Sequence, residues 1–476
     1  MKLTIKILFV ITVFTYSFLF FEQGFGINYL IFSIILTMVI GFIYFKATKL
    51  LLWKIMAFIA TASSFNVAFN HSYVALITNI LSLFILIGLS IDNCSSFLTS
   101  GLQTIYSIVY APILKFINYF GSSTDVSKTK NSFRLTIYII PFAITFIFFL
   151  LYIGGNSIFS SFVSQINLNF ISWLGIFFTL GGFLLLFGIF FPNVSQELIL
   201  FYKSKTETLF RRKSNNKNFK SLGLKTEFLA GKLLLILLNI LLLIVNFLDV
   251  IYLYIIKILP GGVNPSVVVH EGINTLILSI ILAIAIILYL FRGNLNFFKA
   301  NKTLKTLTFI WIVQNILMII NISFKNHFYV LEQGLTFKRI GVFVYLLLTL
   351  IGLITTFYKV NHVKSNWYLI KINSFLFFIV LFTSSFFNWT SIITNYNLTH
   401  ATRAQIDFDY LIDLSDSNIP QLQSLLNNNN INPKQKRHII EKTDHFYYNY
   451  LDKEWKSWNY DDYRINQFLK EQKNKF

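Results

Sequence analysis

Long apolar segments separated by short polar ones dominate the hydrophobic pattern of this chain. The apolar runs are about 18 to 22 residues long, close to the roughly 20 that a helix needs to cross a hydrocarbon layer of about 30 Å. Between Leu233 and Val245 almost every residue is Leu or Ile, without the alternation that a spanning β-strand requires. The pattern therefore predicts an all-α, polytopic transmembrane helical bundle.

Eleven segments are predicted to span the membrane, starting from a cytoplasmic N-terminus. In chain order they are Thr4–Phe21, Ile27–Phe45, Leu50–Ala68, Tyr73–Ile91, Arg134–Ile153, Leu168–Phe191, Phe228–Leu248, Gly272–Leu290, Thr306–Ser323, Ile340–Tyr358 and Ile372–Phe387. The first starts with Lys2 and Lys6 like a signal peptide, but no small-x-small cleavage site follows before Glu22. We therefore expect an uncleaved first span.

The stretch 97–120 has the pattern of a helix that lies on the membrane surface. Its large apolar residues recur every three or four positions, while Ser100, Gln103, Ser107 and Asn118 occupy other faces. Counting it as a span would place the most basic loop outside the cell, against the positive-inside rule. We therefore predict an interfacial helix.

The distribution of charge gives an independent test, because the spans follow from the apolar runs alone. Of the 40 Lys and Arg residues, 25 fall in predicted cytoplasmic segments, four in external loops and eleven after Asn388. Acidic residues divide as five, four and eleven, so the whole formal charge of +20 lies on the cytoplasmic side. This asymmetry is what the positive-inside rule requires.

Three regions follow from these patterns. Residues 1–226 form an N-terminal transmembrane region of about six spans, and residues 227–390 form a transmembrane core of about five spans. Residues 391–476 are polar and aromatic, and we expect a small soluble helical domain outside the cytoplasm. Helix starts are predicted at Asn418, with Pro420 in the first turn, and at Asn459, with acidic residues following it.

The loop 193–227 carries eight basic residues between Lys203 and Lys225. We interpret them as an orientation signal that also contacts anionic lipids of the bilayer. Docking of nucleic acid is not expected, because only Phe210 and Phe219 lie among the basic residues, too few to form a row of stacking platforms.

Standard catalytic and cofactor-binding spacings are absent from the sequence. Gly231-Lys232 resembles the end of a phosphate loop, but Thr226 stands where the first glycine belongs. The single cysteine, Cys94, excludes an internal disulfide and a multi-cysteine metal site. No cofactor and no metal site are therefore predicted.

Asp407-Phe408-Asp409 has the Asp-x-Asp form that metal-using glycosyltransferases employ to hold a nucleotide phosphate. Such pairs also arise at helix starts, where aspartate caps the backbone. Helix capping is the main interpretation, and catalysis is the alternative.

Polar residues near the external ends of the seventh to tenth spans form the candidate site. A charge at the bilayer centre costs about 2.5 to 3.5 kcal/mol on insertion scales and is normally kept with a partner or a purpose. The candidate residues are Asn246, Asp249, His270, Glu271, Asn274, Gln314, Asn315 and Arg339. Ordinary helix-end capping competes with a functional pocket, in which Asp249, His270, Glu271 and Arg339 would form one connected cluster. A zinc-protease site is not expected here, because Asn274 stands where the second histidine would be.

From about Glu227 onward, a series of short motifs occurs in a recognisable order. They are Val245-Asn246-Phe247-Leu248-Asp249, Val269-His270-Glu271-Gly272, Tyr289-Leu290-Phe291-Arg292-Gly293, Trp311-Ile312-Val313-Gln314-Asn315, Glu332-Gln333-Gly334-Leu335-Thr336, Asn395-Tyr396-Asn397-Leu398, Asp407-Phe408-Asp409-Tyr410-Leu411 and Trp455-Lys456-Ser457-Trp458-Asn459. With them the chain resembles a family of uncharacterised bacterial multi-span membrane proteins, the domain of unknown function 4173 group, akin to group 4153. The resemblance implies a bacterial cytoplasmic (inner) membrane and supplies no activity.

Three hypotheses of function remain open. The leading one is binding or transport of a small solute or lipid-linked molecule at the external ends of spans seven to ten. One alternative is a membrane enzyme that modifies envelope glycans or lipids, and the other is a non-catalytic membrane scaffold or sensor.

Overall fold

The computed structural model describes residues 2–92, 96–121, 172–211, 223–251, 265–400, 406–426 and 431–473, with six single positions between 141 and 155. In these ranges the chain forms only helices and turns, apart from one isolated bridge between Thr208 and Lys364. The predicted all-α class is confirmed. Cys94 lies outside the described residues, and so does most of the predicted span Arg134–Ile153.

The α-helices follow the predicted apolar runs closely. They are α1 (Lys2–Phe20), α2 (Ile27–Ile43), α3 (Leu51–Asn70), α4 (Tyr73–Ile91), α5 (Phe97–Gly121), α8 (Trp173–Phe190), α9 (Gln196–Ser204), α10 (Leu224–Val250), α11 (Pro265–Leu290), α12 (Asn301–Gln333), α13 (Phe337–Asn361), α14 (Asn366–Ser384), α15 (Trp389–Thr399), α16 (Phe408–Ile412), α17 (Ile419–Gln423), α18 (Pro433–Leu451) and α19 (Tyr460–Lys473). Within the described ranges, nine helices are long and apolar enough to cross a membrane: α1, α3, α4, α5, α8, α10, α12, α13 and α14. The chain is therefore a multi-pass membrane protein. Shorter apolar helices cover Ile27–Ile43 and Thr275–Leu290.

Helix α12 is much longer than the predicted span, which ended at Ser323. It continues to Gln333, and Gly334 ends it with a positive φ of 79°. Glycine takes this conformation without the steric penalty that a side chain brings, so it is a common stop for a helix. The extension carries polar residues beyond the apolar run, which is why the hydrophobic pattern underestimated its length.

Two compact units make up the chain: residues 1–62, 79–95 and 99–199, and residues 63–78, 96–98 and 200–476. In the first unit, α1 and α8 pack in opposite directions, with Phe9 against Phe183 and Phe190, and Tyr16 stacked on Phe178. Helices α2, α4 and α8 end at the same side of this unit. Tyr44, which ends α2, donates to the Ile189 carbonyl near the end of α8.

Helix α5 covers the predicted interfacial stretch 97–120. By length and composition it could also span a membrane. Its hydrogen bonds to this part of the described chain, however, meet the C-terminal end of α8: Ser107 Oγ donates to the Gly188 carbonyl at 2.7 Å, and Lys115 Nζ donates to the carbonyl of Phe191, the residue after the helix, at 3.0 Å. This position at one side of the unit supports the interfacial interpretation, which stays a prediction.

The polar face of α5 packs against protein. The side chains of Ser100, Gln103, Thr104 and Ser107 are buried, while Leu102, Ile105, Val109 and Ile113 are exposed. The amphipathic pattern therefore has a different cause from the expected one, because the polar residues bind neighbouring helices through contacts such as that between Thr104 and the Phe84 carbonyl.

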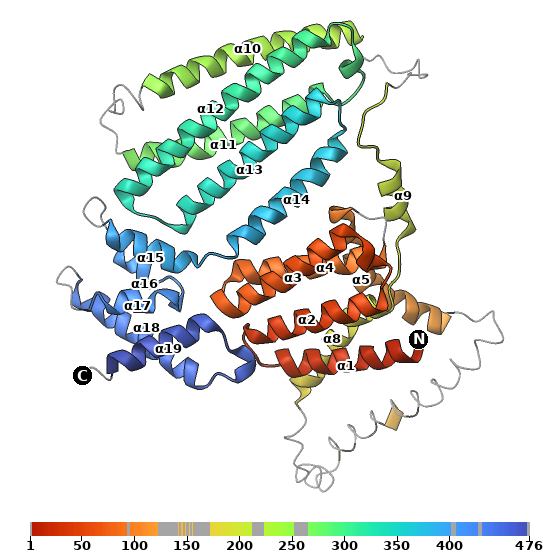
Figure 1. Ribbon diagram of the computed structural model, residues 1–476, viewed down its shortest axis with the longest axis vertical. Helices are drawn as coiled ribbons and strands as arrows, with labels where there is room; N and C mark the ends of the chain where they lie inside the picture. Colours follow the sequence, from red (N-terminus) through yellow and green to blue (C-terminus); the bar gives the residue numbers. More distant parts are fainter. Residues whose placement is uncertain are drawn as a thin grey trace. The chain divides into compact units, whose positions relative to one another are not determined.

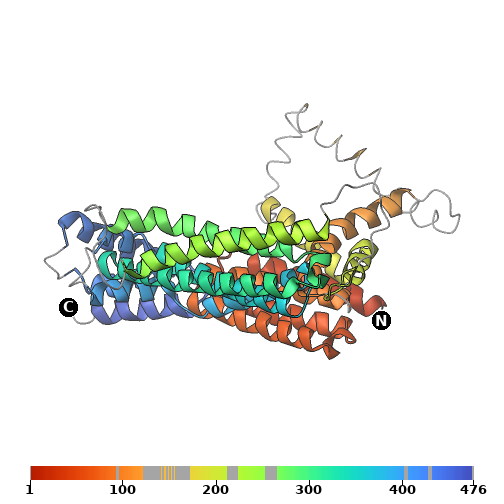
Figure 2. The same ribbon diagram turned by 90° about the horizontal axis from the view of Figure 1, so that it is seen from above.

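The second unit contains helices α10 to α14, drawn in green to blue in Figure 1, and helices α15 to α19 beyond the end of α14 (Figures 1 and 2). Among the described helices, α10 and α12 make the most extensive pairing and run in the same direction, since Asn239 contacts Leu307 and Asn246 contacts Gln314. A core of buried Leu, Ile, Phe and Trp side chains holds α10 to α13 together.

The C-terminal helices have two small cores. One contains Ile393, Leu411, Leu422 and Ile439, and the other centres on Ile419, Phe446, Ile465 and Leu469. Partly buried Leu335, from the turn between α12 and α13, and Ile340, from the first turn of α13, also pack on the first core. The helical nature of this region agrees with the sequence, and its independence as a domain stays a prediction.

The two predicted caps in the tail have different outcomes. Asn459 caps α19, because its Oδ1 accepts from the Asp462 amide at 2.8 Å. The cap predicted for Asn418 is wrong: α17 begins there with Pro420 in its first turn, but the Asn418 side chain makes no capping bond. It donates instead to Thr394 Oγ1 and to the Leu411 carbonyl, so a buried tertiary contact replaces the local one.

Candidate functional site

Polar side chains form a seam between α10 and α12. On α10, Asn239, Asn246 and Asp249 lie seven and three residues apart, which puts them on one helical face. On α12, Gln314, Asn321 and Lys325 are seven and four residues apart and likewise share a face. Asn246 Nδ2 donates to the Gln314 backbone carbonyl at 3.0 Å, which joins the two rows.

Asp249 and Lys325 form an ion pair at the end of the seam. Lys325 Nζ lies 2.7 Å from Asp249 Oδ1, and their side chains are only 23% and 18% exposed. A helical side chain leans toward the N-terminus of its own helix, so Lys325 points back along α12 to the level of Asp249. Sequence reasoning placed Lys325 in an external loop and missed this pair, because it expected α12 to end at Ser323.

Several oxygen atoms of the seam are buried without a hydrogen-bond partner among the described residues. They are Asn239 Oδ1, Asn246 Oδ1, Asp249 Oδ2 and Gln314 Oε1. The amide orientations of Asn239 and Asn246 follow from their surroundings, since each Nδ2 faces backbone carbonyls. An unpaired buried acceptor costs about 1 to 3 kcal/mol, so such a row calls for an explanation.

The other candidates on α12 behave differently from Gln314. Asn315 Nδ2 donates to the Trp311 carbonyl of its own helix at 2.8 Å, which satisfies it locally. Asn321, which the sequence analysis did not select, is 4% exposed, and its Nδ2 has no partner in the described part of the chain.

Arg339 lies in the first turn of α13, next to the turn that follows α12. Its Nη1 donates to the Gln333 carbonyl at 2.8 Å and also to that of Gly334, and its guanidinium lies 4.1 Å from the centre of the Tyr329 ring. These contacts cap the C-terminal end of α12, where a cation is favoured by the helix dipole. The acidic residue Asp249 has Lys325 as its cationic partner.

The side chains of His270, Glu271 and Asn274 lie outside the described residues, although the backbone of α11 runs through all three positions. A single cluster of Asp249, His270, Glu271 and Arg339 therefore stays a prediction.

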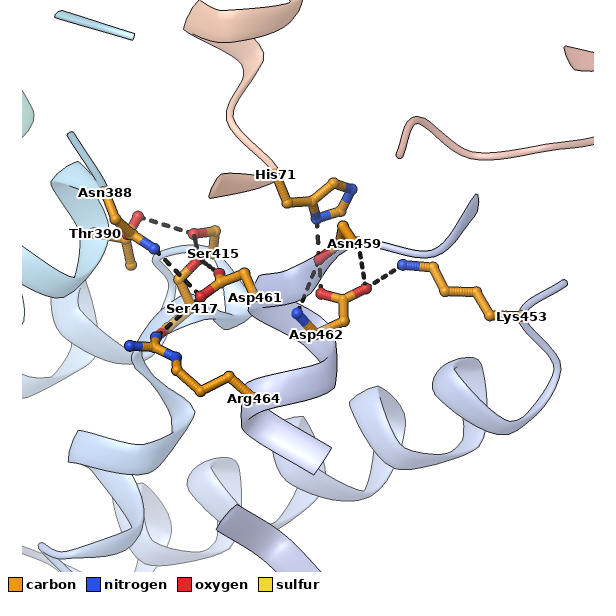
Figure 3. A network of polar contacts seen from close by, with 10 residues as sticks. All are labelled: His71, Asn388, Thr390, Ser415, Ser417, Lys453, Asn459, Asp461, Asp462 and Arg464. Atoms are coloured by element: carbon orange, nitrogen blue, oxygen red, sulfur yellow. Dashed lines mark hydrogen bonds and ion pairs between the residues drawn. The ribbon is translucent and has the colours of Figure 1, made fainter. Parts of the chain in front are cut away.

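A second polar network lies in the C-terminal region and is drawn in Figure 3. His71, from the turn between α3 and α4, points at Asp462, with 3.7 Å between its Nδ1 and Asp462 Oδ1. Lys453 pairs with the other oxygen of Asp462, which also accepts from Asn459 Nδ2 at 2.8 Å. Near the same place Phe69 stacks on Tyr460 with 4.3 Å between ring centres. The turn at His71 is thus attached to the start of α19.

Asp461 forms the other half of this network (Figure 3). Its carboxylate accepts from Ser417 and from Arg464 at 2.9 Å, and Asn388 Nδ2 lies 3.4 Å from it. Burial raises the pKa of Asp461 above its ordinary value, and the hydrogen bond from Ser417 and the charge of Arg464 oppose that change. The network ties the beginning of α15 to α19.

Burial lowers the pKa of His71 from 6.5 to about 4, while the charge of Asp462 acts in the opposite direction. His71 is therefore neutral at neutral pH. Burial also lowers the pKa of Lys442 to about 8. Its ammonium donates to the carbonyls of Ile412 and Leu414 and to Asn418 Oδ1, so it links α18 to the preceding turns.

Asp407-Phe408-Asp409 agrees with the capping interpretation. Asp407 Oδ1 accepts from the Tyr410 amide at 3.0 Å and so caps α16, and Asp409 Oδ1 accepts from Gln435 at 3.1 Å. No group of three or more His, Cys, Asp or Glu side chains suited to a metal ion occurs within the ranges that the structure covers.

Comparison with known proteins places the chain in a family. The family model described as "Domain of unknown function (DUF4153)" matches residues 8–425. The match reaches far upstream of the motifs that begin near Glu227, and it does not show the relation to group 4173. No curated protein matches the chain, and no solved structure does. Since the family model covers most of the 476 residues, this multi-pass membrane protein belongs to the DUF4153 family, a domain family of unknown function.

Proposed function

We propose that this protein binds a hydrogen-bond-donating group of a small solute or lipid-linked molecule at the external ends of α10 to α13. The observation that carries the proposal is the row of buried, unpartnered acceptors on the seam: Asn246 Oδ1, Asp249 Oδ2 and Gln314 Oε1. All three are oxygens, so their chemical complement is a molecule rich in N–H or O–H groups. Binding such a group would remove the desolvation cost of leaving these oxygens unpaired.

The proposed location is the bacterial cytoplasmic membrane, with the N-terminus inside and the C-terminal helices outside. The charge asymmetry of the sequence supports this orientation. The contact between His71 and Asp462 supports the span count rather than the orientation, because it requires the α3–α4 turn and the C-terminal helices to share one side of the membrane. An even number of spans must then lie between them, as in the eleven-span topology with an interfacial α5.

Anionic lipids are the proposed partners of the basic loop 193–227. In its described part, Lys203 lies in the last turn of α9 and is exposed, and Lys205 follows it. Each Lys or Arg near an anionic surface contributes about 1 kcal/mol to attraction at physiological ionic strength. This contact orients the protein and is separate from the external site.

The test uses two cations that share a hydroxyl group and a charge but differ in N–H donors. The melting temperature of the full-length protein in detergent should rise saturably with ethanolamine, which carries three N–H groups. Choline, which carries none, should raise it much less. Equal responses to the two cations would contradict recognition by acceptor oxygens.

Gln314→Met is the matching variant, because it keeps the length of the side chain and removes the unpaired oxygen. We expect it to raise the stability of the ligand-free protein by about 1 to 3 kcal/mol, the cost of an unsatisfied buried group. It should also reduce the ethanolamine response. Asn315→Leu is the control, because Asn315 is satisfied within its own helix, and it should give neither effect. A Gln314→Met protein with unchanged stability and an unchanged ethanolamine response would remove Gln314 from the site.

A further inference from the structure

The first unit contains a long cavity that the polar seam does not involve. Its volume is about 450 Å³, within the range of ligand sites. Its walls come from α1, α2, α4 and α8, with Ile108 of α5 at one end. The helices that enclose it are drawn in red to yellow in Figure 1.

The cavity runs along most of α8, about half of α2 and α4, and the last turns of α1. At one end it reaches Gln23 and Tyr29, beside the turn between α1 and α2. At the other it reaches Ile87 and Ile189, close to the last residues of α4 and α8. The longest lined stretch is Phe178 to Ile189 on α8, and with a rise of about 1.5 Å per residue it extends for about 16 Å, roughly half of a hydrocarbon layer.

The lining is mostly aliphatic and aromatic. Of its polar groups, Ser33 and Asn79 are bonded to each other and to the protein: Ser33 Oγ donates to Asn79 Oδ1 at 3.1 Å, and Asn79 Nδ2 donates to the Ala60 carbonyl at 2.9 Å. A water-soluble molecule would lose its hydrogen bonds to water here with little in return, whereas a hydrocarbon chain has none to lose.

The shape of the wall depends on a glycine. The Tyr16 ring stacks on Phe178 of α8 with 5.0 Å between ring centres and a 9° interplanar angle. A Cβ at Gly182 would lie 2.3 Å from that ring, so the absence of a side chain lets Tyr16 lie flat against α8. The ring therefore forms part of the wall.

The cavity is lined at its side by two exposed apolar residues, Ile80 of α4 and Leu185 of α8, which are 40% and 46% exposed. Buried residues lie deeper, with Leu36 and Leu186 each 3% exposed. In a helix bundle surrounded by lipid, exposed apolar side chains face acyl chains. The lining thus extends from the buried interior to residues that face the hydrocarbon layer.

We propose that this cavity binds one hydrocarbon chain of a membrane lipid, which enters between Ile80 and Leu185. The head group then lies at the end marked by Gln23 and Tyr29, where polar and aromatic side chains suit the membrane interface. The driving force is packing, because the chain leaves one apolar medium for another, and a void without partner atoms forfeits dispersion contacts. A phospholipid and a polyprenyl phosphate both present such a chain.

The test is photolabelling of the full-length protein in vesicles of phosphatidylethanolamine and phosphatidylglycerol, with a diazirine on one phosphatidylglycerol chain. Label should appear on the buried wall residues Leu36 and Leu186, which bulk lipid does not reach. Ile80→Trp should abolish this label by closing the entrance. The control is Ile77→Trp, on the same helix and 50% exposed but outside the lining, and it should leave the label unchanged.

A second variant, Leu185→Trp, closes the entrance from α8 and keeps the test decisive where Ile80→Trp fails to fold. Label confined to exposed positions such as Ile77, or unchanged label at Leu186 in folded Ile80→Trp and Leu185→Trp proteins, would overturn the proposal.

Unlabelled competitors identify the source of the chain. Displacement by polyprenyl phosphate alone indicates a lipid carrier, and displacement by phosphatidylglycerol alone indicates a phospholipid.

Discussion

The ion pair of Asp249 and Lys325 is partly buried, and this makes its energetics testable. Lys325→Met leaves the Asp249 carboxylate without its cation, and its Oδ2 already has no partner in the described chain. We expect a loss of about 1.5 to 3 kcal/mol in unfolding free energy, typical of hydrogen bonds to charged groups. The double variant with Asp249→Asn should recover much of the loss, because no charge is then stranded.

The control for this pair is Lys371→Met. Lys371 and Glu207 are also 2.7 Å apart, but their side chains are 30% and 44% exposed. Water screens this pair, so the variant should cost less than about 1 kcal/mol. Equal losses at both sites, measured by chemical unfolding in detergent, would contradict a special role for the seam.

His71 makes the C-terminal attachment sensitive to pH. Its folded pKa of about 4 lies below the unfolded value of 6.5, so the unfolded state binds more protons between these values. Stability should therefore fall as the pH drops from about 6.5 toward 4. Burial raises the pKa of Asp461 and Asp416 above their ordinary value of 3.8, so the folded state binds more protons at these two groups. Their contribution to stability therefore rises as the pH falls toward 3.8, opposite to that of His71.

Comparison with His71→Gln isolates the contribution of the histidine. The difference in melting temperature between wild type and variant should change between pH 7 and pH 4.5, with wild type losing more stability. A difference that is constant over this range would show that His71 does not change its charge on unfolding.

Helix class and most helix positions were predictable from the sequence, because lipid-facing helices need long apolar runs whatever their neighbours are. The end of α12 was not predictable, since the helix continues through Lys325 and Asn326 to Gly334, where the backbone conformation stops it.

Pairings between residues far apart in the sequence were also not predictable. Nothing local to His71 indicates Asp462, and nothing local to Asn418 indicates Lys442. Of the candidate residues, Asn246 and Gln314 are brought together, and Asp249 lies on the same face of α10 as Asn246.

The C-terminal helices should fold without the membrane region if the fragment includes α15. A fragment starting at Asn388 keeps Ile393 in its core and the bond from Asn388 to Asp461. We expect a helical circular-dichroism spectrum with a cooperative melt, because the charges of the tail are balanced and its helices have buried apolar faces.

A fragment starting at His400 is the matched control, because it lacks α15 and so loses part of the first core. It should melt at a lower temperature and less cooperatively. Identical melts would show that α15 belongs energetically to the membrane region, and a disordered spectrum for the longer fragment would contradict an independent domain.

The orientation of the whole chain in the membrane decides on which side the basic loop and the C-terminal helices lie. A cytoplasmic N-terminus and eleven spans place the basic loop 193–227 inside and the tail outside. The proposed ligand site at the ends of α10 and α12 that carry Asp249 and Lys325 is external only with this orientation. Every functional proposal for the seam therefore depends on this orientation of the chain in the membrane.

Cysteine accessibility in intact cells tests this orientation most directly, because the chain contains a single natural cysteine. In a Cys94→Ser background, Lys434→Cys places an exposed thiol on α18, and Lys203→Cys places one in α9. A membrane-impermeant maleimide should label Lys434→Cys in intact cells and Lys203→Cys only after the membrane is opened. Labelling of Lys203→Cys in intact cells, with Lys434→Cys protected, would reverse the orientation and contradict the account.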